Sequence, residues 1–266
     1  YGLNRLPAIT KLEKKISSNS VSATWVKQAS GDWSLLTQLQ AMLYHGFTRT
    51  TQYWLIPYLK KLIEIDSSKS LMPPLELLIR IDHQLYASNI EGTILQKAIS
   101  YPVKNKPVTV HQIPDNPNNY HVYGQYWFYK MDWVIYYLSK TQEKALNSED
   151  VSSFVFTARN SVEHIYPQKD GSGKEWLHNF GNLVLISVGM NSAYSDLPIF
   201  EKEAKHQSFK QKNSRSETLK LDLFYKDFNK QSAPADVVKN HQLTCINLLK
   251  TYNDFIVNCD PEFKKG

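Results

Sequence analysis

The chain has 266 residues, of which 42% are apolar and 21% are charged. This composition excludes a disordered tail, and the lack of any run of about 18 apolar residues excludes a membrane-spanning helix. The net charge of +6 mildly favours a polyanionic partner such as nucleic acid. Cys245 and Cys259 are too few for a disulfide framework, so we expect reduced core thiols in a cytoplasmic protein.

The first 150 residues have the pattern of a helical region. Apolar residues recur at helical spacing in four segments, residues 32–44, 53–65, 75–88 and 125–145. Residues 102–121 contain four prolines and predict a loop. The last of the four helices is rich in aromatic residues, which favour packing in a core or an interface over binding of a cofactor.

The pattern changes at about Val151. Three short β-prone runs follow, at residues 154–157, 161–165 and 183–187. Three more helices are expected over residues 198–212, 218–229 and 234–257. We therefore predict an α+β fold that is predominantly α-helical. Its three parts are a helical region over residues 1–150, a small ββα core over residues 151–215, and C-terminal helices over residues 216–266 that pack on this core.

Four polar residues stand at the ends of the two later β-prone runs. Glu163 and His164 close the first run, Asn182 begins the second, and Asn191 follows it, before an expected helix. A strand, a loop, a strand and a helix with these residues form the layout of a ββα-metal nuclease of the HNH type. No complete P-loop, serine-hydrolase or zinc-protease motif competes with this interpretation.

This set of side chains suits hydrolysis of a phosphodiester bond. An imidazole with a pKa near ~6.5 can deprotonate water, which makes His164 the candidate general base. The oxygen atoms of Glu163 and Asn191 are ligands that Mg²⁺ or Mn²⁺ prefers. Asn182 either orients the imidazole or ties the loop so that His164 faces the phosphate. Neighbouring residues of a strand face opposite sides, so Glu163 and His164 can share a site only where the strand ends, before Pro167.

The segment resembles the C-terminal HNH domain of the GmrSD-type restriction endonucleases. The stretches that carry the resemblance are Glu-His-Ile-Tyr-Pro-Gln at residues 163–168 and Gly-Asn-Leu-Val-Leu at residues 181–185, followed by Asn191, Phe200 and Lys202. The resemblance implies a bacterial phage-defence nuclease that cleaves modified phage DNA with the help of Mg²⁺ or Mn²⁺.

The resemblance also implies a partner domain. GmrSD-type proteins carry an N-terminal ParB-like nucleotide-hydrolysing domain, whose Asp-Gly-Gln-Gln-Arg signature is absent from this chain. Since the chain begins with Tyr1 rather than Met, we expect it to be the C-terminal half of a longer protein. The helix around residues 126–132 is similar to the one that leads into the nuclease domain. Many HNH enzymes carry His where Asn191 stands, and the amide favours Mg²⁺ or Mn²⁺ over tightly held Zn²⁺.

Each site residue also has an ordinary structural interpretation. His164 can be a structural histidine, Glu163 a surface carboxylate, Asn182 a turn residue and Asn191 a helix cap. The alternative function is accordingly a non-catalytic module that binds nucleic acid or a protein partner and keeps a degenerate HNH fold. The intact set of four residues favours the nuclease.

The lysines after the motif have two interpretations. Lys202 and Lys205 are the candidate nucleic-acid contacts, on a helix whose basic residues form either a DNA-facing edge or an ordinary polar face. That edge would consist of Lys202, Lys205, Lys210, Lys212 and Arg215. His178 and His206 are expected to be surface residues.

Overall fold

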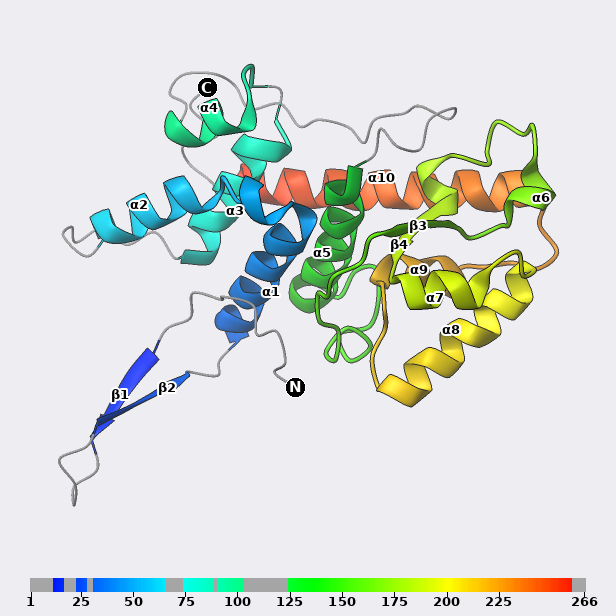
Figure 1. The fold of residues 1–266 in the computed structure, drawn as a ribbon, viewed down its shortest axis with the longest axis horizontal. Coiled ribbons are helices and arrows are strands. Elements are labelled where there is room, and N and C mark those ends of the chain that lie inside the picture. The colour runs from blue at the N-terminus through cyan, green and yellow to red at the C-terminus, as the bar shows by residue number, and fades with distance from the viewer. Residues whose placement is uncertain are drawn as a thin grey trace.

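The computed structural model describes residues 12–16, 23–27, 31–65, 74–88, 90–102 and 124–259. The first part of the chain forms β1 (Leu12–Ile16), β2 (Ala23–Lys27), α1 (Gly31–Gly46), η1 (Arg49–Thr51), α2 (Leu55–Ile65), α3 (Pro74–Tyr86), α4 (Ile94–Ile99) and α5 (Gly124–Gln142). The second part forms β3 (Ser161–His164), α6 (Gln168–Gly171), η3 (Phe180–Asn182), β4 (Leu183–Ile186), α7 (Val188–Tyr194), α8 (Ile199–Asn213), α9 (Leu219–Lys226) and α10 (Pro234–Cys259). Figure 1 shows these two parts side by side, with α10 running behind both.

The fold is mostly helical, as the sequence predicts. All seven helices expected from apolar periodicity are present, with ends that differ by a few residues. The runs at residues 161–165 and 183–187 form the antiparallel pair β3–β4. The β1–β2 hairpin and the short helices α4, α6 and α7 have no counterpart in the predicted pattern. The predicted loop over residues 102–121 lies outside the described residues except at its first position.

The run at residues 154–157 is not a strand, which corrects the sequence prediction. Phe154 and Phe156 are buried while Val155 is 46% exposed, so the alternation that suggests a strand is real. One backbone group of this segment has a side-chain partner, because the side-chain amide of Gln38 donates a hydrogen bond to the carbonyl of Phe154 at 2.7 Å. Alternating burial therefore arises here in an irregular segment whose backbone has partners other than a neighbouring strand.

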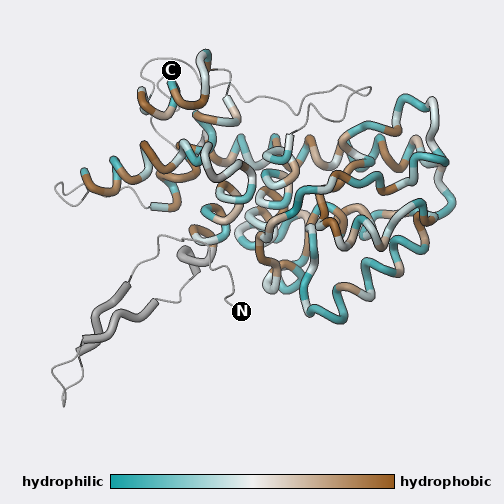
Figure 2. The backbone as a smooth tube through the Cα atoms, viewed as in Figure 1, coloured by the Kyte–Doolittle hydropathy of each residue, from teal (hydrophilic) through white to brown (hydrophobic). Residues whose placement is uncertain are grey.

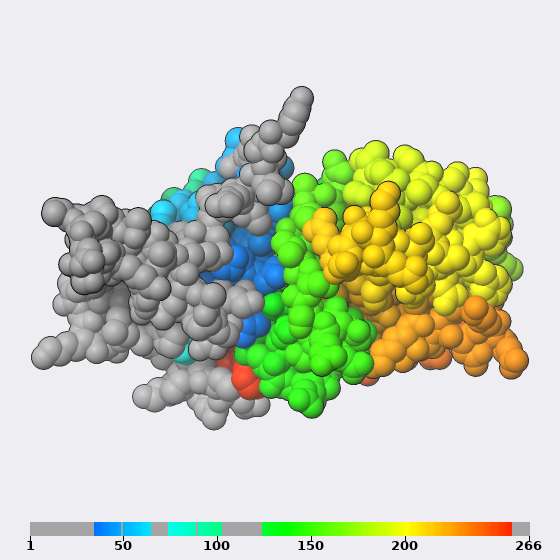
Figure 3. Space-filling view, turned by 90° about the horizontal axis from the view of Figure 1, so that it is seen from below, coloured from blue at the N-terminus to red at the C-terminus, as the bar shows by residue number. Residues whose placement is uncertain are grey.

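Helix α5 is the central element. Thirteen of its residues are buried, and it packs against α1, α9, α10 and β4. A helix covered on all sides is a core helix, so its aromatic residues are structural, as expected. Figures 1 and 3 show α5 and the chain after it between α1 and the elements around α8. In Figure 2, α8 on the outside is hydrophilic over most of its length.

Strand β4 lies between two hydrophobic cores. Leu183 and Leu185 belong to the large core around α1, α3, α5 and α10. Val184 and Ile186 belong to a smaller core. Since successive side chains of a strand face opposite sides, β4 is buried on both faces and joins the helical part to the part that carries the motif.

Two further observations concern sequence expectations. Cys245 is a free, fully buried thiol in α10, and burial raises its pKa to about 11, while the side chain of Cys259 lies outside the described residues. No helix among the described residues is long and apolar enough to cross a membrane.

Candidate active site

The motif residues lie at one end of the β3–β4 hairpin. In the antiparallel register, Glu163 pairs with Val184 and His164 pairs with Leu183. Beyond the strand end, the amide of Ile165 still donates to the carbonyl of Asn182 at 2.8 Å. Helix α7 packs against β3, and α8 packs against α7. The hairpin therefore brings Glu163, His164 and Asn182 to one edge, with α7 and α8 beside them.

The side chain of Asn182 closes the loop between the two strands. It is fully buried, and its Oδ1 accepts a hydrogen bond from the amide of Tyr166 at 2.9 Å. Its Nδ2 donates to the carbonyls of Leu177 at 2.9 Å and Tyr166 at 3.4 Å. These contacts with loop backbone match the loop-tying role rather than a direct contact with the imidazole.

Two helices outside the hairpin hold this loop in place. Lys220 of α9 is buried and donates through Nζ to the carbonyls of Phe180 at 2.7 Å and Leu183 at 2.6 Å. Burial lowers the pKa of Lys220 to about 8. Gly181 lies against α10 so closely that a Cβ atom there would stand 2.3 Å from the carbonyl oxygen of Val238. The position of Asn182 is therefore set by α9 and α10 together.

His164 is a buried, neutral imidazole. The residue is 4% exposed, and desolvation, helped by electrostatic repulsion from Lys202, lowers its pKa to about 4. Nε2 lies 3.0 Å from Nδ1 of His178, and Nδ1 lies 3.3 Å from Nε2 of Gln168. At pH 7 this histidine is unprotonated on one nitrogen, which is the state that a general base requires.

Glu163 and Lys202 form an ion pair beside this imidazole. Nζ of Lys202 lies 2.5 Å from Oε1 of Glu163 and donates to the carbonyl of His164 at 2.7 Å. Burial raises the pKa of Glu163, and the hydrogen bond and charge of Lys202 oppose that shift. Lys202 is fully buried, so its ammonium group holds the strand end from within the fold.

Asn191 lies inside α7 rather than before a helix. The cap of α7 is Ser187, whose hydroxyl accepts from the amide of Met190 at 3.2 Å, so the interpretation of Asn191 as a cap is wrong. Asn191 is half-buried, and its side chain makes no hydrogen bond to the part of the chain that the structure describes.

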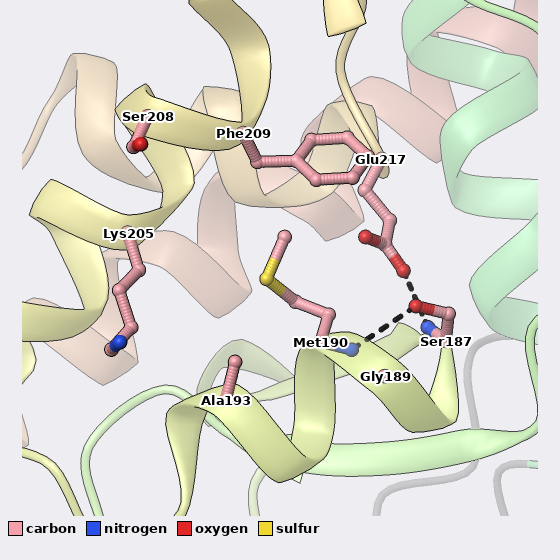
Figure 4. Close-up of a pocket in the computed structure, with 8 residues that line it drawn as sticks. All are labelled: Ser187, Gly189, Met190, Ala193, Lys205, Ser208, Phe209 and Glu217. Atoms are coloured by element: carbon pink, nitrogen blue, oxygen red, sulfur yellow. Dashed lines mark hydrogen bonds between the residues drawn. The ribbon is translucent and has the colours of Figure 1, made fainter. Parts of the chain in front are cut away.

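Lys205 lies away from the hairpin end. It is exposed and lines a hollow of about 350 Å³ together with Met190, Phe209 and Glu217. Figure 4 shows Lys205 and Glu217 on opposite sides of this hollow, with the carboxylate of Glu217 directed toward Ser187. Lys205 thus retains the exposure that a phosphate contact requires.

The structure corrects the expectation that His178 and His206 are surface residues. His206 is fully buried and lies 2.6 Å from Oδ1 of Asp222, which also pairs with Lys210 at 3.1 Å. His178 is half-buried against His164. The spacing of residues along the sequence predicts neither contact. One contact depends on the conformation of a loop and the other on the packing of separate helices, and neither of these produces a repeating pattern in the sequence.

The oxygen ligands of the candidate metal site suit a hard cation. Within the described residues, no group of three or more His, Cys, Asp or Glu side chains is placed to hold a metal ion. Mg²⁺ keeps several waters and commonly takes one or two protein ligands plus substrate phosphates. The oxygen atoms of Glu163 and Asn191 are of the type that Mg²⁺ binds, whereas a Zn²⁺ site would need more nitrogen or sulfur ligands.

The fold and the site define a mainly helical α+β domain with a cluster of His, Glu, Lys and Asn at a hairpin end. Residues 115–239 match the family model of the GmrSD restriction endonucleases, C-terminal domain. Searches of curated proteins and of solved structures gave no match. The family match confirms the resemblance inferred from the motif and indicates a nuclease-related function with DNA as the substrate class. The match spans α5 to α9 and the start of α10, and it excludes α1 to α4.

Proposed function

We propose that this chain is a metal-dependent DNA endonuclease of the HNH type from a bacterial restriction system, with His164 as the general base. The observation that carries the proposal is a neutral, buried imidazole at the end of β3, next to a carboxylate. It lies within the segment that matches a restriction endonuclease domain.

The chemistry assigns a role to each residue at the hairpin end. His164 removes a proton from water, so that the water oxygen attacks the phosphorus atom as the leaving oxygen departs. Glu163 and Asn191 would hold Mg²⁺ or Mn²⁺. When bound, the cation neutralises charge that develops on the phosphate and the leaving oxygen. Asn182 keeps the loop closed, which fixes the direction of His164.

The two lysines take different roles in this proposal. Lys202 is buried, neutralises Glu163 and fixes the strand end, so it positions the candidate metal ligand. Lys205 is exposed and is the candidate for a phosphate contact. Binding through such contacts carries little sequence information and weakens steeply with salt. Recognition of modified phage DNA then falls to a ParB-like nucleotide-hydrolysing partner domain, in the cytoplasm of the bacterium.

The decisive experiment is cleavage of supercoiled plasmid with Mg²⁺, with Mn²⁺ and with EDTA. The wild-type chain is expected to nick DNA with either cation and to lose activity on chelation. His164→Ala removes the base and is expected to lower the rate by at least ~10²-fold. Circular dichroism checks that the variant is folded.

Two outcomes would contradict the proposal. Cleavage that survives exhaustive chelation would exclude the metal-dependent mechanism. Near wild-type nicking by folded His164→Ala would exclude the base. Salt-sensitive DNA binding without cleavage under any condition would instead support the non-catalytic binding module.

A further inference from the structure

The hollow beside Lys205 contains a buried carboxylate oxygen that no group among the described residues pairs with. This oxygen is Oε2 of Glu217, a residue that lines the hollow and is 7% exposed. The other oxygen, Oε1, accepts a hydrogen bond from the amide of Ser187. A buried acceptor without a donor is energetically unfavourable. The hollow therefore favours a ligand that brings an N–H group to Oε2.

The walls around this oxygen are largely apolar. Met190, Ala193 and Phe209 line the hollow. Figure 4 shows the second carboxylate oxygen of Glu217 directed toward Met190, with the ring of Phe209 beside it. An aromatic ring is a surface on which the flat face of a nucleobase stacks, and the flexible thioether side chain of Met190 can move aside for a ligand. The volume of about 350 Å³ lies at the lower end of the ~300–1,000 Å³ range of small-molecule sites.

Lys205 gives the hollow a second polar end. It is exposed and lies across the hollow from Glu217 (Figure 4). A simple anion would use Lys205 alone, and a simple cation would use Glu217 alone. A nucleotide carries a phosphate at one end and the hydrogen-bonding edge of its base at the other. The hollow therefore matches a nucleotide whose base edge meets Glu217, whose base stacks on Phe209 and whose phosphate meets Lys205.

The hollow lies near the hairpin end. Lys205 follows Lys202 by three residues on α8, so the two lysines lie about one helical turn apart. Ser187 directly follows β4, whose first residue pairs with His164. The length of β4, about 10 Å at ~3.4 Å per residue, thus separates the hollow from the hairpin end. One strand of duplex DNA rises by ~3.4 Å per nucleotide, so a base a few nucleotides from the cleaved phosphate can reach the hollow.

We infer that this hollow binds one unpaired nucleobase of the DNA substrate and selects cytosine or adenine over thymine. Cytosine and adenine present an amino group that donates to a carboxylate, whereas thymine presents the carbonyl oxygen O4 at that position. The base must be unpaired, because pairing uses the same edge. The position near the cleaved phosphate rests on the proposed function. The base contact adds a preference to the phosphate contact of Lys205, which carries none by itself.

The test is an NMR titration in EDTA, so that no metal-dependent cleavage occurs. The methyl group of Met190 lies in the hollow and is the reporter in a chain with four methionines. We expect dCMP and dAMP to shift its signal and to bind ~10-fold more tightly than dTMP, as for one hydrogen bond to a charged group. A single-stranded thymidine oligonucleotide with one central cytosine should shift the same signal more than the all-thymidine strand. A shift with dCMP but not with this oligonucleotide would indicate a site for free nucleotides and overturn the assignment to DNA.

Three substitutions check the contacts, with circular dichroism to confirm folding. Glu217→Gln keeps an oxygen for the amide of Ser187 and points an amide NH₂ group into the hollow, so the preference should reverse toward dTMP. Ala193→Phe fills the hollow from an exposed position and should abolish the shift with every nucleotide. Lys205→Ala should weaken the binding of all three nucleotides about equally, because it removes only the phosphate contact.

These measurements separate the inference from the proposed function. If the base preference and its reversal are observed but the chain never cleaves DNA, the proposed function fails while the base site stands. Equal binding of dCMP and dTMP by the wild-type chain would overturn the inference even if the chain nicks plasmid. A shift of the Met190 signal that survives Ala193→Phe would overturn it as well, because the nucleotide would then bind outside the hollow.

Discussion

Buried ion pairs differ between the helical part of the molecule and the candidate site. Around α5, Lys130 pairs with Asp82 and Arg159 pairs with Asp132, and no side chain of these pairs is more than 2% exposed. At the site, the side chain of Lys202 is 1% exposed but that of Glu163 is 14% exposed. The pairs around α5 are closed to solvent on both sides. The site pair is partly exposed to solvent on its acid side.

Asp132 shows what a closed pair does. Oδ2 receives the guanidinium of Arg159 at 2.5 Å, while Oδ1 accepts from the hydroxyl of Thr218 at 2.9 Å and the amide of Lys220 at 2.8 Å. The carboxylate of Asp132 thereby accepts a hydrogen bond from a backbone amide in the first turn of α9, which has no partner within the helix. Helix α9 then holds the hairpin loop through the side chain of Lys220. The difference teaches that the closed pairs build the scaffold, whereas the open pair keeps its carboxylate partly exposed to solvent.

The largest stability loss is expected from Asp132→Asn. It leaves the guanidinium of Arg159 buried without its counter-charge, which typically costs about 3–5 kcal/mol. Urea denaturation measures the change. The control is Glu76→Gln, since Glu76 is 43% exposed in its pair with Arg80 and should change stability by no more than about 1 kcal/mol. Equal effects of the two substitutions would refute the structural role given to Asp132.

A second prediction concerns the contact between α10 and the hairpin. Gly181→Ala places a methyl group against the backbone of Val238 and should destabilise the fold by about 1–3 kcal/mol, because backbone cannot move aside cheaply. Gly189→Ala in α7 is the matched control, since nothing lies within 4 Å of its Cβ position. The control should be neutral or stabilise the helix by up to about 1 kcal/mol. Thermal melts of both variants distinguish a steric effect from a general effect of added side chains.

The pH dependence of stability tests the buried histidines of both regions. Burial, assisted by Lys130, lowers the pKa of His83 in α3 to about 4, and burial, assisted by Lys220, lowers the pKa of His241 in α10 well below its usual value. The unfolded chain takes up protons at these residues near pH ~6.5, while the native chain does not. Stability is therefore full above that pH and falls as the pH drops toward 4, by up to about 1.4 kcal/mol per pH unit for each such histidine.

Denaturation at pH 7, 6 and 5 measures this slope. His241→Gln removes one titrating group and should flatten it, and His83→Gln should do the same in the helical part. A slope that neither substitution changes would show that other groups govern the acid response.

The smallest effect on stability is expected at the open pair. Glu163→Gln removes the charge opposite Lys202, but solvent reaches the acid side, so the loss should be well below that of Asp132→Asn. Its main effect should be on activity, as a higher concentration of Mg²⁺ or Mn²⁺ needed for half-maximal cleavage. Titration of each cation in the nicking assay measures the shift. A stability loss as large as that of Asp132→Asn would remove the distinction between the open and the closed pairs.

Local sequence pattern sufficed for seven of the helices and for the residues that meet at the hairpin. Apolar periodicity predicts the seven long helices, because a helix must cover one face with apolar side chains to be buried. The spacing of Glu163, His164 and Asn182 predicts that they meet at one hairpin end, because an antiparallel pair brings the end of one strand to the start of the next.

Long-range packing decided the rest. Three features depend on which elements pack together. They are the burial of Lys202, the contact of His178 with His164 and the irregular path of residues 154–157. A lysine on a polar helix is expected to be exposed to solvent. Lys202 is buried because its ammonium group donates to the carboxylate of Glu163 and to the carbonyl of His164, which both lie on another element. The alternating burial around Phe154 and Phe156 predicts a strand. The backbone partner of Phe154, which is the side chain of Gln38, shows that the segment is irregular. The sequence by itself determined the seven long helices and the residues gathered at the hairpin, since both follow from local spacing. Only the tertiary structure decided which charges are closed and which are open, because burial and hydrogen-bond partners come from residues far apart in the chain.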